Sequence, residues 1–209
     1  MPKNYVSNGT TSERMFKNGF MESLSKVHYS VPLFIYIPVI VFFVYRSFTV
    51  ADNTVGWFFL YLAAGIFIWT ITEYILHRYI FHFVPKSKWG LRLHFIFHGV
   101  HHDFPRDAKR LVMPPSASIP LALLFYFLFL WLVPARLMDA FFAGFLIGYL
   151  AYDMTHYAIH HGNFKSRIMK SIKQHHMLHH YADSTKGYGV SSSLWDIFFQ
   201  SGFEKEKKQ

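Results

Sequence analysis

The sequence predicts an all-α integral membrane protein, with a bundle of four transmembrane helices and a helical cap on the cytoplasmic side that holds a histidine-rich site. Three observations support this fold class. Hydrophobic residues make up 52% of the 209 residues and charged residues only 16%, whereas a soluble domain usually carries about 25% charged residues. Four long apolar runs follow one another, and dense histidine clusters stand beside them. We therefore expect lipid to be part of the solvent.

The four apolar runs are the candidate membrane spans. They are VPLFIYIPVIVFFVY from Val31, GWFFLYLAAGIFIWTITEYIL from Gly56, IPLALLFYFLFLWLV from Ile119 and AFFAGFLIGYLAY from Ala140. A spanning helix needs about 20 mainly apolar residues. The second run meets this length alone, the first and third meet it with their flanks, and the fourth is short. Buried hairpins of a soluble protein are the alternative, which four such runs in one short chain disfavour.

The basic residues predict the orientation of the spans. Seven Lys or Arg residues lie from Arg78 to Arg110, eight follow Asn163 and four lie in the N-terminal tail, while the short connections hold only Arg46 and Arg136. Cytoplasmic loops carry such an excess. Four spans place all the basic segments, and every histidine cluster, on the cytoplasmic side.

Length and composition narrow the classes of protein further. We expect a polar tail over residues 1–28 and a single domain over residues 29–209, which contains the four spans and the cap. The absence of cysteine excludes disulfides, thiolate zinc sites and iron–sulfur clusters. The net charge of +9 favours anionic lipid headgroups over nucleic acid as the partner, because the chain is rich in aromatic and apolar residues.

The histidines recur at the spacing of metal ligands. Residues three and four apart share a helical face, so each set with this spacing can aim two or three imidazoles at one point. These sets are His98, His101 and His102; His156 and His160; and His176, His179 and His180. His77 and His82 are five apart, which suits a helix end better than a regular helix. The ten nitrogens nearly satisfy two octahedral metal ions, which need roughly twelve positions.

Four histidines do not need a role at a metal. We interpret His28 as a solvated side chain, and His94, His161 and His175 as extra histidines beside better-spaced sets. A pH sensor uses clustered histidines but does not need repeated ligand spacing. Imidazole suits zinc, copper, iron and nickel alike. A single-zinc hydrolase needs only three ligands, whereas two metals with open positions suit oxygen activation.

The order of these motifs resembles the fatty acid hydroxylase / sterol desaturase superfamily, and the resemblance covers about residues 70–200. Two further strings, KRLVMPP (109–115) and GYGVSSSLWD (187–196), are similar to the fatty acid 2-hydroxylase branch, whose enzymes hydroxylate the acyl chain of sphingolipids. Fungal and animal members of this branch carry a fused cytochrome b5 domain. We expect no such domain in this chain, and hence a bacterial or stand-alone form.

The resemblance implies a membrane di-iron mono-oxygenase that hydroxylates C2 of a long acyl chain with O2 and two electrons. The implied cofactors are two iron ions on the ten histidines. Zinc binds nitrogen sites more tightly than ferrous iron, so purified protein can carry zinc instead. The implied partners are the lipid substrate, O2 and a separate electron donor such as a cytochrome b5 or a ferredoxin with its reductase. The location would be the inner membrane of a bacterium or the endoplasmic reticulum of a eukaryote.

Three acidic residues are candidates to support the ligands, because a metal-bound histidine usually donates its other ring N–H to a carboxylate or carbonyl. Glu73 lies four residues before His77 inside a span, where an acidic residue is functional by default. Asp153 lies three residues before His156. Asp103 directly follows His102, and a solvated loop acid is the alternative for it.

Two other functions remain open. The same site could perform another oxidation, as a carotenoid or sterol hydroxylase or a desaturase; only the two strings, by resemblance, argue against this. The chain could also be a membrane metal-binding or transport protein. Transport places ionisable residues along a path through the middle of the membrane, whereas the histidines here gather at one face.

Overall fold

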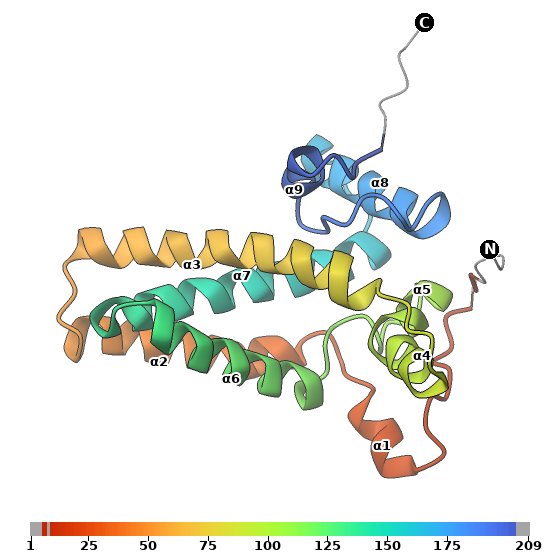
Figure 1. The fold of residues 1–209 in the computed structure, drawn as a ribbon, viewed down its shortest axis with the longest axis horizontal. Coiled ribbons are helices and arrows are strands. Elements are labelled where there is room, and N and C mark those ends of the chain that lie inside the picture. The colour runs from red at the N-terminus through yellow and green to blue at the C-terminus, as the bar shows by residue number, and fades with distance from the viewer. Residues whose placement is uncertain (1–5, 8, 204–209) are drawn as a thin grey trace, which may run out of the picture. The chain divides into compact units, whose positions relative to one another are not determined.

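The computed structural model describes residues 6–7 and 9–203, and these residues form helices and no strand. In chain order the elements are α1 (Gly19–Leu24), α2 (Val31–Thr49), α3 (Val55–Ile75), η1 (Leu76–Phe81), α4 (Lys88–His94), η2 (Phe95–Gly99), α5 (Val100–Asp103), α6 (Pro115–Leu132), α7 (Ala135–His161), α8 (Arg167–Tyr181) and α9 (Leu194–Phe198). Figure 1 shows them along the chain. The all-α prediction is confirmed.

The chain divides into two compact units. The bundle unit comprises Arg14–Thr72 and Val112–Met154, and the histidine unit comprises Glu73–Leu111, Thr155 onward and the described residues before Arg14. Helices α3 and α7 each begin in the bundle unit and end in the histidine unit. Their last turns therefore supply residues to the histidine unit.

Four helical segments are long and apolar enough to cross a membrane. They are Val31–Thr49, Val55–Phe81, Pro115–Leu132 and Ala135–His161, with mean hydropathies of 1.9, 1.8, 1.8 and 1.3. The four predicted spans are thus confirmed, and the protein is a multi-pass membrane protein. The fourth span is longer than its apolar run, because α7 continues through polar residues at both ends.

Helix α7 is the central helix of the bundle unit. In its most apolar stretch 72% of the residues are buried, against 11–22% in the other three spans. Aromatic rings surround it: Phe142 packs edge-on against Phe43 of α2, and Phe145 packs edge-on against Trp69 of α3 and Phe129 of α6. The outward faces of the other spans stay apolar and exposed, as for Trp131, which suits contact with lipid.

Two glycines allow α3 and α7 to touch backbone to backbone. A Cβ atom built on Gly144 would lie 2.0 Å from the Leu62 carbonyl oxygen, and one built on Gly65 would lie 2.0 Å from the Phe141 carbonyl oxygen. Membrane helices approach closely at such small residues. Any larger side chain at either position would force the two helices apart.

Short elements build the histidine unit. Two of them, η1 and η2, are π-helical turns, which are rare and often occur at functional sites. In η1 the His82 backbone N–H donates to the His77 carbonyl at 3.1 Å, so residues five apart stand one above the other. The five-residue spacing is thus accommodated by a π-helical turn that His82 directly follows.

Candidate metal centre

The histidine unit gathers ten imidazoles into two groups of five. In each group the ligand-type nitrogens all lie within 4.8 Å of one another. The first group contains His77, His82, His98, His102 and His179, and the second contains His101, His156, His160, His176 and His180. These are the ten histidines that the sequence singled out as candidate ligands.

The first group draws on four elements. His77 comes from η1, His82 follows it directly, His98 and His102 come from η2 and α5, and His179 comes from α8. The Nε2 atom of His98 lies 3.2 Å from that of His77, 3.0 Å from that of His82 and 2.9 Å from that of His102. The Nε2 atoms of His179 and His82 are 2.9 Å apart.

The second group is built in the same way around His176 of α8. Its Nε2 atom lies 3.1 Å from that of His156, 3.0 Å from that of His160 and 3.0 Å from that of His180. His156 and His160 come from the end of α7. The Nε2 atom of His101, from α5, lies 3.0 Å from that of His156.

These separations fit metal ions and do not fit hydrogen bonds. A neutral imidazole carries a single N–H, yet the Nε2 atom of His98 lies within 3.2 Å of three other Nε2 atoms, as does that of His176. Two nitrogens that bind one metal ion at right angles and at about 2.1 Å lie about 3.0 Å apart. Each group therefore presents lone pairs that suit a shared cation.

The two sets of three histidines divide between the two groups, so each set aims two imidazoles at one group and the third at the other. His98 and His102 enter the first group, while His101 enters the second. On α8 His176 and His180 enter the second group, while His179 enters the first. Successive helical residues are about 100° apart, so i+3 and i+4 lie on opposite flanks of i and can point to different groups.

This division brings the two groups together. The ring of His102 stacks on the ring of His180 with centroids 4.2 Å apart. The ring of His101 packs against that of His102 with centroids 5.8 Å apart. The two groups are therefore neighbouring parts of one centre rather than two separate sites.

The outer ring nitrogens of several ligands bond to backbone carbonyls. The Nδ1 atom of His77 donates to the Tyr188 carbonyl, and that of His179 donates to the Lys186 carbonyl at 2.7 Å. A ring nitrogen of His160 bonds to the Pro105 carbonyl. A proton on Nδ1 leaves the Nε2 lone pair free to bind a metal.

Electrostatics keeps the imidazoles uncharged. Burial, followed by repulsion from neighbouring imidazoles, lowers the pKa of His82 to about 2, and burial lowers the pKa of His179 to about 4. The same causes lower the pKa well below its usual value at His98, His101, His102, His176 and His180. Neutral imidazole is the form that binds metals.

Glu73 holds the loop that carries the Tyr188 carbonyl. Its carboxylate accepts hydrogen bonds from the Val190 N–H at 2.9 Å, from the Ser191 N–H at 2.8 Å and from the Ser191 hydroxyl at 2.6 Å. The side chain is 5% exposed. Through this loop the carboxylate fixes the partner of His77.

Asp196, which sequence reasoning did not select, holds the same loop from its other side. Its carboxylate accepts from the Tyr188 N–H at 2.9 Å, the Gly189 N–H at 2.7 Å, the Ser201 hydroxyl at 2.7 Å and the His175 ring at 2.9 Å. Burial would raise the pKa of Asp196, but these hydrogen bonds outweigh it and lower the pKa. The only sequence signal was an acid inside an apolar segment, at the end of the string GYGVSSSLWD.

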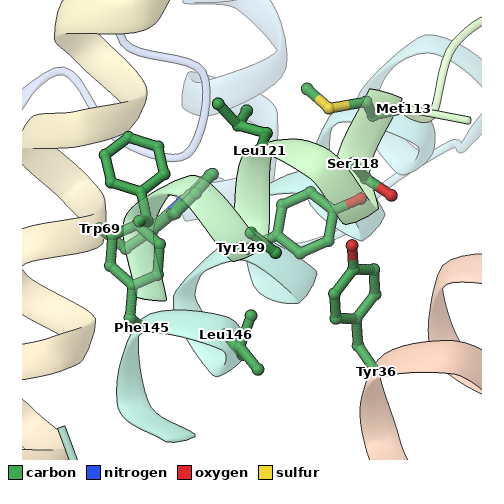
Figure 2. Close-up of a pocket in the computed structure, with 10 residues that line it drawn as sticks. Tyr36, Trp69, Met113, Ser118, Leu121, Phe145, Leu146 and Tyr149 are labelled. Carbon is green, nitrogen blue, oxygen red and sulfur yellow. The ribbon is translucent and has the colours of Figure 1, made fainter. Parts of the chain in front are cut away.

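Asp153 lies in the bundle unit and bonds there to other residues. Its carboxylate accepts from the Met113 N–H at 3.2 Å and the Tyr149 hydroxyl at 3.1 Å. Figure 2 shows the Tyr149, Ser118 and Tyr36 hydroxyls gathered at one end of a cavity whose other walls are apolar. Asp153 thus ties the segment before α6 to α7.

Asp103 and the four unassigned histidines lie outside both groups. Burial raises the pKa of Asp103, and the nearby His94 opposes this shift. His28 is exposed and contacts the Ser30 hydroxyl at 2.8 Å, and His175 bonds to Asp196. Among the described residues, His94 and His161 likewise lie outside the two groups.

Fold and site together define a multi-pass membrane protein with a buried, all-imidazole centre suited to two metal ions. The chain belongs to the fatty acid hydroxylase family, because the model of that family matches residues 62–201. The family and the histidine groups both indicate metal binding.

Relatives and a solved structure agree with this assignment. The dihydroceramide fatty acyl 2-hydroxylase FAH1 of Arabidopsis thaliana is 39% identical, over 89% of this chain and 78% of that protein. The human fatty acid 2-hydroxylase is 37% identical, over 90% of this chain and 56% of that protein. The structure of full-length Scs7p, in which only the hydroxylase domain is visible, matches with a TM-score of 0.85 at 36% identity, over 92% of this chain and 72% of that one.

Proposed function

We propose that this protein is a membrane di-iron mono-oxygenase that hydroxylates C2 of a long acyl chain in a sphingolipid-type lipid, with O2 and two electrons. The pair of five-imidazole groups carries the proposal. Support also comes from relatives named as fatty acyl or fatty acid 2-hydroxylases in Arabidopsis thaliana and human, and as a ceramide very long chain fatty acid hydroxylase in Saccharomyces cerevisiae. The family alone leaves the reacting carbon open.

The ten histidines of the two groups would hold the two iron ions, five on each. An octahedral ion has six positions, so each group leaves about one for O2, water or substrate. Iron supplies the redox chemistry that O2 requires and zinc lacks. The backbone carbonyls of Tyr188 and Lys186 keep the protons of His77 and His179 on Nδ1.

Three carboxylates complete the proposed site in supporting roles. Glu73 acts on His77 through the loop that it holds. We assign Asp153 and Asp103 to the segments that carry His156 and His102, because of their positions in the sequence. Burial of the imidazoles limits the access of water, which protects a strong oxidant from side reactions.

The charged residues of the chain bear on its orientation in the membrane, and the chemistry of the reaction bears on its electron donor. We propose that residues 29–209 act as one hydroxylase domain whose histidine segments face the cytoplasm, since the flanking segments carry most Lys and Arg residues. The membrane would be the inner membrane in a bacterium and the endoplasmic reticulum in a eukaryote. A separate electron donor, such as a cytochrome b5 or a ferredoxin with its reductase, would supply the electrons.

The test is product analysis with labelled oxygen. The purified protein would be loaded with ferrous iron under nitrogen, placed in lipid nanodiscs with a ceramide, and given reductant and isotopically labelled O2. We expect mass spectrometry to find one labelled oxygen at C2 of the acyl chain. A new double bond or an oxidised ring in sterol or carotenoid trials, with no 2-hydroxy product, would refute the proposal.

A further inference from the structure

The proposed reaction needs electrons from outside the centre. Conversion of a C–H bond and O2 into C–OH and H2O consumes two electrons and two protons. Carriers that deliver electrons one at a time must therefore approach the centre twice in each turnover. The binding site of such a carrier is inferred here on the basis of the proposed function.

Helix α8 has a ligand face and an exposed basic face. His176, His179 and His180 lie buried on the first. Arg167 and Lys170 are exposed one turn apart near the start of the helix. A rise of 1.5 Å per residue places Lys170 about 9 Å along the axis from His176. One rigid helix thus joins surface cations to ligands of both groups.

Among the residues that the structure describes, no ion pair neutralises the basic face of α8. No acidic residue occurs between Asp153 and Asp183 in the sequence. Lys165, Arg167 and Lys170 are exposed, and among the described residues no ion pair joins them. Free surface cations attract an acidic partner and raise its rate of association.

The turn after α8 links the surface to a ligand by one hydrogen bond. The side chain of Lys186 is exposed, while its carbonyl oxygen accepts the Nδ1–H of His179 at 2.7 Å. Asp183, the acid of this turn, is engaged by the Thr185 N–H and hydroxyl at 2.9 and 2.6 Å. Backbone at the surface is therefore bonded directly to a ligand of the first group.

A second basic surface of the histidine unit differs in character. Around α4, Lys86 and Lys88 alternate with the exposed apolar side chains of Phe83, Val84 and Trp89, which are 62–74% exposed. Such a mixture is typical of a lipid interface. Between the cations of α8 the large exposed apolar side chain is Ile168. A small apolar spot beside exposed cations suits the small interfaces of electron-transfer encounters.

We propose that the exposed face of α8, formed by Lys165, Arg167, Lys170 and the turn at Lys186, is the docking surface for an acidic one-electron carrier protein. The carrier holds a haem or an iron–sulfur cluster. Its electrons enter beside His179, where the surface backbone bonds to a ligand.

The test uses the full chain, loaded with iron, in nanodiscs of neutral lipid. A soluble cytochrome b5 domain with its reductase serves as donor, and dithionite serves as a donor that needs no docking. Arg167→Glu and Lys170→Glu together should raise the KM for the cytochrome about threefold to tenfold at low salt. Turnover with dithionite should stay unchanged. The matched control, Lys86→Glu with Lys88→Glu, should leave both values within about twofold.

Three outcomes of the turnover assay would overturn the proposal. The first is an unchanged KM for the cytochrome in the α8 variant. The second is an equal effect in the α4 control, which would indicate net charge alone. The third is an effect that appears only when anionic lipid is present, which would identify the partner as the membrane surface.

Direct binding of the cytochrome to the nanodisc-held protein tests the docking without turnover. Loss of binding in the α8 variant alone supports the docking surface, whereas absence of binding to the wild type rejects it. Absence of product with dithionite, in contrast, would refute the proposed hydroxylase function.

Discussion

Replacement of Asp196 by asparagine should release one metal ion and spare the other. Each oxygen of the Asp196 carboxylate accepts two hydrogen bonds. Oδ1 accepts from the Tyr188 N–H and the Ser201 hydroxyl, and Oδ2 accepts from the Gly189 N–H and the His175 ring. Asparagine has one acceptor oxygen, so the backbone N–H of either Tyr188 or Gly189 loses its partner whichever way the amide turns. The carboxylate is fully buried, so water cannot replace it.

The loss of restraint on the loop follows from that one bond. A hydrogen bond to a charged group contributes about 1.5–3 kcal/mol, so the loop over residues 186–190 loses roughly 1.5–3 kcal/mol of restraint. This loop carries the carbonyls that hold His77 and His179, and both belong to the first group. Loss of such supporting contacts typically weakens metal binding about 10–100-fold. In the second group, the carbonyl that bonds to His160 is that of Pro105, which lies outside this loop.

The assay is the metal content of the purified protein during titration with a chelator. The wild type should release its two ions over one range of chelator, and Asp196→Asn should pass through a stage with one ion per chain. Asp183→Asn makes the same chemical change in the neighbouring turn, where the partner is Thr185, and should resemble the wild type. Equal loss of both ions, or retention of both, would show that the loop does not hold the first group.

Three further predictions concern the ligands, the helix crossing and the metal. His101→Ala and His179→Ala should each reduce hydroxylation below about a tenth, since small misplacements at a site can cost about a hundredfold, whereas His28→Ala should be nearly neutral; equal damage at all three would contradict our choice of ligands. Gly144→Ala should lower the thermal midpoint in detergent, because its Cβ would overlap the α3 backbone, whereas Gly56→Ala meets nothing within 4 Å; equal shifts would exclude the close crossing. Protein loaded only with zinc should be inactive until ferrous iron replaces it, and equal activity of the zinc form would favour hydrolysis.

Hydropathy predicted the spans because a helix that crosses a membrane needs a long apolar run. It could not predict how far α7 extends beyond that run. Asp139 directly precedes the apolar run, near the start of that helix, and its carboxylate pairs with Arg46 of α2 at 3.3 Å. Asp153 directly follows the run and bonds to Tyr149 and the Met113 N–H. A polar residue satisfied by a distant partner is indistinguishable, in sequence, from one that ends a helix.

The sequence selected ten histidines but not the way they divide. The spacing shows which side chains can lie on one helical face, but it does not show whether they point to one histidine group or to two. The loop was harder still, because its supports are remote: Glu73 bonds to Val190 and Ser191 across more than a hundred residues. Asp196 lies in the five-residue helix α9, too short to show any periodicity.

The division of adjacent histidines explains how short elements hold the two histidine groups side by side. His101 and His102 of α5 serve different groups, as do His179 and His180 of α8. The positions of the two sites relative to each other are therefore fixed by the 100° step between neighbouring residues of a helix, not by loops. The loop over residues 186–190 has a separate task, since its carbonyls orient rings that the helices have already placed. Helices thus set where the nitrogens stand, and the two buried carboxylates, through the loop, set which nitrogen of His77 and His179 is free to bind.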